Sequence, residues 1–144
     1  MKRALRRFFP PLLLMAAIHL LSRVPGTIAA EDPEIYRIFI WTPPAVQNLL
    51  HVPVFALLAW LWSRALEGCH SNWPTAYLLP LLITAAYGLF DEWWQLSVPG
   101  RYASLTDLGL NLLGAFLGLA CRVCLKGAPS DRQAGGCRLC RPLD

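Results

Sequence analysis

The amino-acid sequence predicts an all-α protein, an integral membrane bundle of four transmembrane helices. Hydrophobic residues make up 56% of the 144-residue chain and charged residues only 15%, which is too apolar for one small soluble domain. Apolar stretches recur along the chain, and each approaches the ~20 residues that a helix needs to cross a bilayer. Lys and Arg are concentrated in the segments that would lie on one side of such a bundle.

The predicted helices span residues 8–22, 49–66, 75–97 and 104–121 and form one membrane domain over residues 1–122. Pro10 and Pro11 fit the first turn of the first helix, where a missing backbone N–H costs nothing. A cleaved signal peptide is an alternative for this stretch, because residues 27–30 resemble a cleavage site. We expect residues 35–41 to lie on the membrane surface.

The distribution of Lys and Arg predicts the orientation of the bundle. With the N-terminus inside, the outer side holds only Arg23, Arg37 and Arg101, and all other basic residues lie inside. Tryptophans agree, since interfacial belts favour them. Trp41, Trp93 and Trp94 fall at the outer boundary and Trp60, Trp62 and Trp73 at the inner one. Both termini are therefore expected in the cytoplasm, and the net charge of +4 needs no nucleic-acid partner.

Polar side chains gather at one end of the predicted bundle. The third helix ends with Asp91, Glu92 and Gln95, the fourth begins with Asp107 and Asn111, and His51 lies in the first turn of the second. Burying a charged group against lipid costs roughly 2.5–3.5 kcal/mol on insertion scales, so these side chains must face one another, a ligand or water. This end of the bundle, on the outer side, is therefore the candidate functional region.

Helical spacing adds two further expectations. The two stripes that share a helix face are Thr84, Gly88, Asp91 and Gln95 on the third helix and Asp107, Asn111, Gly114 and Gly118 on the fourth. Gly114 and Gly118 make a small-xxx-small surface that allows close helix approach in lipid. Ser104, followed three residues later by Asp107, predicts a cap at the start of the fourth helix.

Four short patterns carry a family resemblance. They are SxxP at residues 22–25, YGxxDExxQ at 87–95, PGR at 99–101 and DxxxNxxGxxxG at 107–118. Together with His51 they resemble the VanZ-like family of small bacterial membrane proteins over roughly residues 15–122. One position departs from the pattern, because Phe55 stands where an aromatic hydroxyl is expected, four residues after His51.

The resemblance implies a multi-pass protein of the bacterial cytoplasmic (inner) membrane. The family is named after a protein associated with resistance to the glycopeptide teicoplanin, which implies a role in the cell envelope and in antibiotic resistance. No biochemical activity follows from that name, so the site residues have to be interpreted by their chemistry.

The leading hypothesis is an outward-facing polar pocket that binds an anionic lipid or a lipid-linked cell-wall precursor. The predicted ligand-binding residues are Gln95, Arg101, Asp107 and Asn111. Arg101, in a loop flanked by Pro99 and Gly100, is suited to hold a phosphate or carboxylate through charge-assisted hydrogen bonds. An effect on teicoplanin susceptibility is suggested by the family resemblance alone.

Two other functions stay open, so the sequence does not decide whether the protein is an enzyme. In a membrane-embedded lipid hydrolase or transferase, Asp91 or Glu92 would be the general base and His51 its proton partner, although neither Ser97 nor Ser104 resembles an activated nucleophile.

In a structural helper of another membrane protein, Arg101 would pair with Asp91, Glu92 or Asp107. Gln95 and Asn111 would then hydrogen-bond across the third and fourth helices. Three acids facing one certain cation are more than such a scaffold needs.

Metal binding has two possible locations. His51, Asp91, Glu92 or Asp107 offer oxygen and nitrogen ligands. At the C-terminal end, Cys121, Cys124, Cys137 and Cys140 resemble a four-thiolate zinc site. We favour incidental cysteines in a basic, disordered cytoplasmic tail over residues 123–144, and expect no other cofactor. His19 is expected to be satisfied by a neighbouring helix, away from the outer end, and His70 to be solvated.

Overall fold

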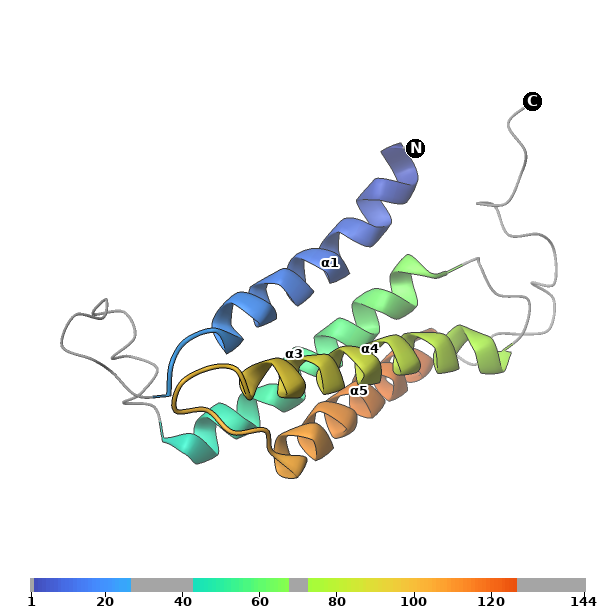
Figure 1. Ribbon diagram of the computed structural model, residues 1–144. Helices are drawn as coiled ribbons and strands as arrows, with labels where there is room; N and C mark the ends of the chain where they lie inside the picture. Colours follow the sequence, from blue (N-terminus) through green and yellow to red (C-terminus); the bar gives the residue numbers. More distant parts are fainter. Residues whose placement is uncertain (1, 27–42, 68–72, 127–144) are drawn as a thin grey trace.

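The structure, a computed structural model, describes residues 2–26, 43–67 and 73–126. Within these ranges all regular secondary structure is helical, in four elements: α1 (Lys2–Ser22), α3 (Pro44–Ala65), α4 (Trp73–Gln95) and α5 (Leu105–Lys126) (Figure 1). The all-α class and the number of helices are therefore confirmed for the described part of the chain.

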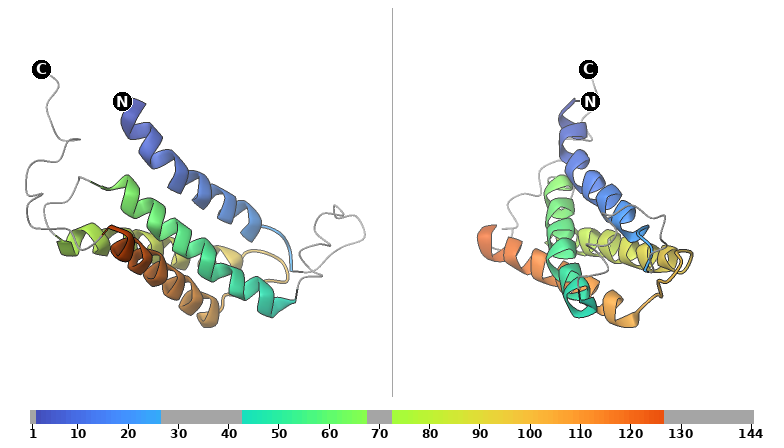
Figure 2. Two further views of the ribbon diagram at one scale, coloured as in Figure 1. Left: turned by 180° about the vertical axis from the view of Figure 1, so that it is seen from behind. Right: turned by 90° about the vertical axis from the view of Figure 1, so that its left-hand side faces the viewer.

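Successive helices run in opposite directions, so their ends meet in two groups. The segment after α1, the start of α3 and the α4–α5 loop lie at one end, and the N-terminus, the end of α3, the start of α4 and the end of α5 lie at the other (Figures 1 and 2). Helix α5 packs most extensively against α3, and α1 contacts only α3 and α4 to any extent. Helix α1 is thus the peripheral member of the bundle.

Three of the described helices are long and apolar enough to cross a membrane. Their candidate spans are Leu5–Ser22, Val46–Ala65 and Leu105–Leu125. Helix α4 has 23 residues, which is sufficient length, but Asp91, Glu92 and Gln95 lower the hydropathy of its last turns. Large apolar side chains such as Leu12, Leu82 and Phe116 are exposed on the bundle surface, as expected for groups that face lipid.

The helix boundaries differ from the predicted ones. Helix α1 begins at Lys2 instead of residue 8, because its basic residues are good helix formers although they are not apolar. Pro10 and Pro11 therefore lie inside the helix and not in its first turn as expected. Helix α3 begins at Pro44 instead of residue 49, with proline in the favourable first position. Helix α5 extends to Lys126 instead of residue 121, so the expected boundary between domain and tail at residue 122 falls inside a helix.

The contact between α3 and α5 depends on the absence of side chains at two glycines. A Cβ atom at Gly114 would collide with the backbone carbonyl of Val52, and one at Gly118 with that of Ala56. The helices therefore approach backbone to backbone, which confirms the predicted small-residue surface.

The main hydrophobic core lies where α1, α3 and α4 meet, beside a smaller cluster of Ala59, Ala115 and Leu119 between α3 and α5. The buried members of the main core are Ile18, Phe55, Leu58, Trp62, Ala65 and Tyr87. The Tyr87 hydroxyl donates a hydrogen bond of 2.6 Å to the carbonyl oxygen of Met15 and so ties α4 to α1. Trp62 is part of this core, and its ring packs against Phe8 of α1.

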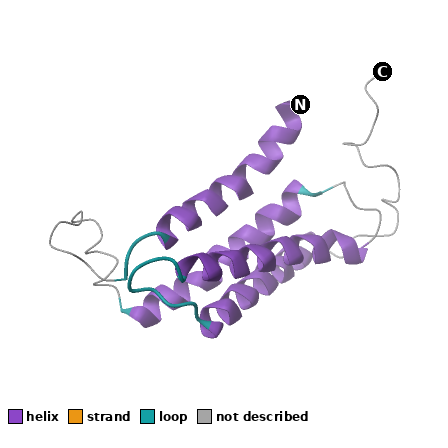
Figure 3. Ribbon diagram, in the orientation of Figure 1, coloured by secondary structure: helices purple, strands orange, loops and turns teal. Residues whose placement is uncertain are grey.

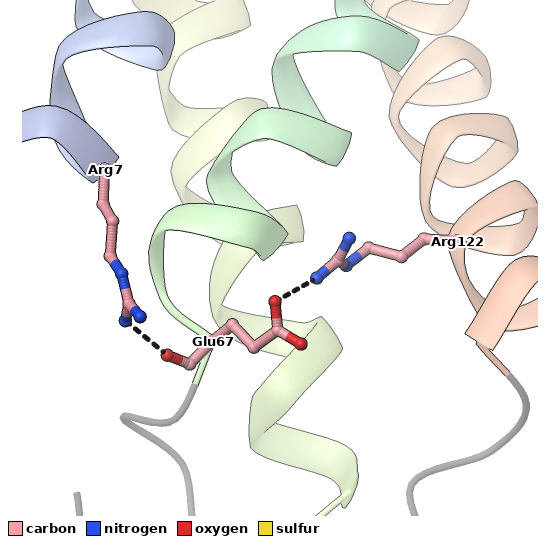
Figure 4. Close-up of polar contacts among 3 residues, drawn as sticks. All are labelled: Arg7, Glu67 and Arg122. Carbon is pink, nitrogen blue, oxygen red and sulfur yellow. Dashed lines mark hydrogen bonds and ion pairs between the residues drawn. The ribbon is translucent and has the colours of Figure 1, made fainter. Parts of the chain in front are cut away.

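Polar contacts close the end of the bundle that carries the N-terminus (Figure 4). Arg122 of α5, only 4% exposed, forms an ion pair of 3.0 Å with Glu67, which follows α3. Arg7 of α1 donates to the backbone carbonyl of Glu67 at 3.2 Å. The guanidinium groups of Arg64 and Arg122 lie 4.8 and 6.0 Å from the ring of Trp60. Basic side chains thus join three helices at this end.

Candidate functional site

At the opposite end, three helices bring polar side chains together. The polar cluster consists of His51 from α3, Asp91, Glu92 and Gln95 from α4, and Asp107 and Asn111 from α5. Glu92 is close enough to Asp91, Asp107 and His51 to interact with each electrostatically. All members except His51 are buried, so the cluster is inside the bundle and not on its surface.

The two predicted stripes explain how these helices present the cluster. Thr84, Gly88, Asp91 and Gln95 are all buried on α4, and Asp107, Asn111, Gly114 and Gly118 are all buried on α5. A Cβ atom at Gly88 would lie 3.2 Å from the Phe55 ring and 3.3 Å from Asn111 Nδ2. Glycine at this position therefore lets Asn111 approach α4 closely.

A hydrogen bond of 2.7 Å joins His51 Nδ1 to Asn111 Oδ1. A carbonyl oxygen can only accept, so His51 Nδ1 carries the hydrogen, and the neutral ring has Nε2 as its acceptor. The Phe55 ring is stacked against His51 at 6.1 Å and against Tyr87 at 6.3 Å. Phe55 thus supports the imidazole but supplies no hydroxyl. His51 itself lies about two turns into α3, because this helix begins earlier than predicted.

The α4–α5 loop is anchored to the cluster through Ser104. Its backbone N–H donates to Glu92 Oε2 at 2.9 Å, and its hydroxyl oxygen accepts from the Asp107 N–H at 3.3 Å. Ser104 is therefore the N-cap of α5, as predicted. The contact of its backbone with Glu92 was not anticipated, because the conformation of the preceding loop decides it.

These contacts leave a buried oxygen of each of the three acids without a hydrogen-bond partner. Gln95 Nε2 donates to Asp91 Oδ2 at 3.2 Å. The buried atoms without a hydrogen-bond partner at this end are Asp91 Oδ1, Glu92 Oε1, Asp107 Oδ1, Asn111 Nδ2, His19 Nδ1 and Trp94 Nε1. Buried polar atoms normally have a partner, and leaving one without costs about 1–3 kcal/mol. The cluster therefore has unused capacity to bind hydrogen-bonding groups.

Arg101 does not pair with the acids of α4 and α5, as it would if the protein were a structural helper. It is partly buried in the loop between α4 and α5, and among the described residues the ion pair is that of Arg122 with Glu67, with none between Arg101 and the acids of the cluster. The bonds that the structural-helper alternative requires from Gln95 and Asn111 between α4 and α5 are also absent from the described residues. Gln95 bonds within α4, and Asn111 bonds to α3.

Backbone packing fixes this loop against the segment that follows α1. The Gly26 N–H donates to the Pro99 carbonyl at 3.0 Å, and a Cβ atom at Gly26 would collide with the carbonyl of Gly100. Gly100 has a φ of 73°, which glycine adopts without strain. Residues 23–26 and 96–104 therefore lie side by side (Figure 3), and the SxxP and PGR patterns meet in space.

His19 lies nearer to this site than predicted. Its ring is 4.9 Å from that of Trp94 and 5.9 Å from that of Phe90, both on α4. The neighbouring helix supplies aromatic contact but no hydrogen bond to Nδ1. The signal for this position was present in the sequence, since His19 is one turn before the SxxP pattern at the same end of the bundle.

The described His, Cys, Asp and Glu residues contain no group of three that could hold a metal ion. Cys121 and Cys124 are exposed on α5 with free thiols. Cys137, Cys140 and His70 lie outside the described residues, as do the possible cleavage site and residues 35–41. The tail zinc site therefore stays a prediction, which the zinc content of a Cys137→Ala, Cys140→Ala variant would test.

Fold and site together define a multi-pass α-helical membrane protein with a buried polar cluster at one end of the bundle. A family model described as VanZ/LLP1 matches residues 6–126. The chain belongs to this family, which confirms the resemblance inferred from the sequence patterns. Comparisons with curated proteins and with solved structures gave no match.

Proposed function

We propose that the polar cluster binds the head group of an anionic lipid or a lipid-linked cell-envelope precursor. The observation that carries this proposal is the set of buried atoms without a partner. Three of them are acceptors, Asp91 Oδ1, Glu92 Oε1 and Asp107 Oδ1, and one is the donor Asn111 Nδ2. A head group with both donors and acceptors would satisfy these atoms and remove the cost of leaving them unpaired.

Arg101 supplies the positive charge in this proposal. It lies in the loop that Glu92 and Ser104 hold against the cluster, and it has no ion pair with the described acids. A guanidinium group binds phosphate through paired, charge-assisted hydrogen bonds. Arg101 would hold the lipid phosphate while the cluster contacts the rest of the head group.

We place the cluster at the outer surface of a bacterial cytoplasmic membrane, with all four helices crossing it and both termini in the cytoplasm. The end of the bundle with the N-terminus carries Arg6, Arg7, Arg64 and Arg122, whereas the described basic residues of the cluster end are Arg23 and Arg101. This bias supports the orientation. Exposed Trp93 and Tyr102 at the cluster end suit a membrane interface.

The consequence for the cell is an effect on the envelope. A protein that holds a lipid-linked precursor at the outer leaflet changes how much of it is accessible to glycopeptides, and susceptibility to teicoplanin would change with expression. The family membership supports an envelope role, and the ligand chemistry is our proposal.

A membrane-embedded lipid hydrolase or transferase is the second candidate, and the His51–Asn111 bond favours it. This bond fixes the imidazole with Nε2 as acceptor, as a general base requires. The Ser104 hydroxyl oxygen caps α5 and Ser97 is exposed, so water is the nucleophile best suited to this site. His51 would take a proton from that water.

Lipids that co-purify with the protein test the first candidate. Wild type is compared with Arg101→Ala and with Arg6→Ala, a control that removes an exposed arginine at the opposite end. We expect phosphate-bearing lipid bound to wild type and to the control but largely lost from Arg101→Ala, with helicity unchanged. Equal lipid content in all three would reject the proposal.

Turnover tests the second candidate. Purified wild type and His51→Ala are incubated with lipid extract, and product lipids are followed by mass spectrometry. Formation of a product only with wild type would support catalysis, and unchanged lipid profiles with both would eliminate it.

A further inference from the structure

The three carboxylates of the cluster share one deficiency. Asp91, Glu92 and Asp107 are 0, 5 and 9% exposed, and each has one oxygen without a partner. The other oxygens of Asp91 and Glu92 already accept from Gln95 and Ser104. Three of the four cluster atoms without a partner are therefore acceptors, which need hydrogen-bond donors.

The negative charge of the three acids also limits which donor group of a ligand can bind them. The titratable groups at the cluster end include the three acids, His51 from α3, His19 from α1 and Tyr87, which is close enough to Asp91 to interact with it electrostatically, and the described residues supply no ion pair to any of these acids. Buried negative charges without a partner are costly. A group that carries both a positive charge and hydrogen-bond donors would balance the charge of the acids and also supply partners for their oxygens.

We propose that the lipid head group carries a primary ammonium group, which the carboxylates of Asp91, Glu92 and Asp107 bind. This inference rests on the proposed function: the head group keeps the phosphate of the proposed ligand and carries an ammonium group as well, so that it can be zwitterionic. A primary ammonium has three N–H donors and no acceptor, as many donors as there are buried carboxylate oxygens without a partner. A hydroxyl group brings no charge, and a quaternary ammonium has no N–H.

A metal ion is not the ligand that the described residues favour, because no three of the described His, Cys, Asp and Glu residues are placed to hold one. Calcium and magnesium require several oxygens at about 2.0–2.6 Å, whereas an ammonium group is held by N–H···O contacts of about 2.7–3.2 Å. The remaining donors, Asn111 Nδ2 and Arg101, are then available to the phosphate of the same head group.

The ligand class is a lipid with a phosphate and a primary amine. It is tested with full-length protein and short-chain phosphatidylethanolamine, phosphatidylcholine and phosphatidylglycerol, which share the phosphate and the acyl chains. We expect phosphatidylethanolamine to bind at least about tenfold more tightly than the other two, the ratio that one charge-assisted hydrogen bond supplies. Glu92→Gln should remove this preference, and Glu67→Gln, at the opposite end of the bundle, should keep it.

Three outcomes are informative. Equal binding of the three lipids, still dependent on Arg101, would overturn the ammonium inference and leave the proposed lipid binding intact. Absence of binding of all three would overturn both. Competition by soluble phosphoethanolamine as effective as by the lipid would show that the site takes the head group without a membrane anchor, which contradicts a lipid ligand.

Discussion

His51 Nδ1 lies 2.7 Å from Asn111 Oδ1, and this hydrogen bond joins α3 to α5 at the cluster end of the bundle. The bond fixes the imidazole ring that Phe55 supports from one side. It also holds Asn111 in the position where Gly88 leaves room for its amide nitrogen. One side-chain pair therefore links α3 to α5 and holds Asn111 against α4.

The first prediction concerns the strength of this pair. In a double-mutant cycle of His51→Ala and Asn111→Ala, we expect a coupling free energy of about 0.6 and at most about 1.7 kcal/mol, the range of side-chain hydrogen bonds between membrane helices. Reversible unfolding in detergent measures it. Additive effects of the two substitutions would show that the pair does not stabilise the bundle.

The second prediction concerns the close approach of α3 and α5. Gly118→Ala should destabilise the bundle by more than 1 kcal/mol, on the order of an overpacked core, because its Cβ atom would collide with the backbone of Ala56. Gly109→Ala is the matched control on the same helix, since nothing lies within 4 Å of its Cβ position.

Alanine at Gly109 should be neutral or stabilising, by up to about 1 kcal/mol from helix propensity. Unfolding midpoints of the two variants in the same detergent measure the difference. Equal midpoints would mean that α3 and α5 are not in backbone contact.

The third prediction concerns the attachment of α1, the peripheral helix. Tyr87→Phe removes the hydroxyl that donates to the Met15 carbonyl at 2.6 Å and should cost about 0.5–1.5 kcal/mol of stability. Tyr102→Phe is the control, because Tyr102 is 83% exposed. Faster proteolysis within α1 in the Tyr87 variant but not in the control would confirm the role of this bond.

Much of the fold was predictable because it depends on patterns within single helices. Apolar length indicated the helices, the spacing of Asp91 and Gln95 indicated a buried face, and Ser104 with Asp107 indicated a cap. Each depends only on local geometry, which the sequence specifies directly.

The details of the site were less predictable, because they depend on which helices are neighbours. In the structural-helper alternative Asn111 would bond toward α4, but it bonds to α3, since the glycine contact brings α5 closest to α3. Arg101 was a candidate partner for the acids, but the loop conformation at Gly100 and its packing against Gly26 decide where it lies. Sequence spacing carries no information on such contacts between distant segments.

The last prediction concerns orientation, on which the proposed outward position of the cluster depends. We expect a reporter fused to the C-terminus to be cytoplasmic and a single cysteine replacing Arg101, in a variant without other cysteines, to react with a membrane-impermeant thiol reagent in intact cells. A cysteine replacing Arg64, in the last turn of α3, is the matched control and should react only after the membrane is opened. The physical reason is the excess of basic residues at the end of the bundle that carries the N-terminus, which favours retention of that end in the cytoplasm. The reverse pattern of labelling would place the polar cluster on the cytoplasmic side, and the ligand would then have to be sought among lipids of the inner leaflet.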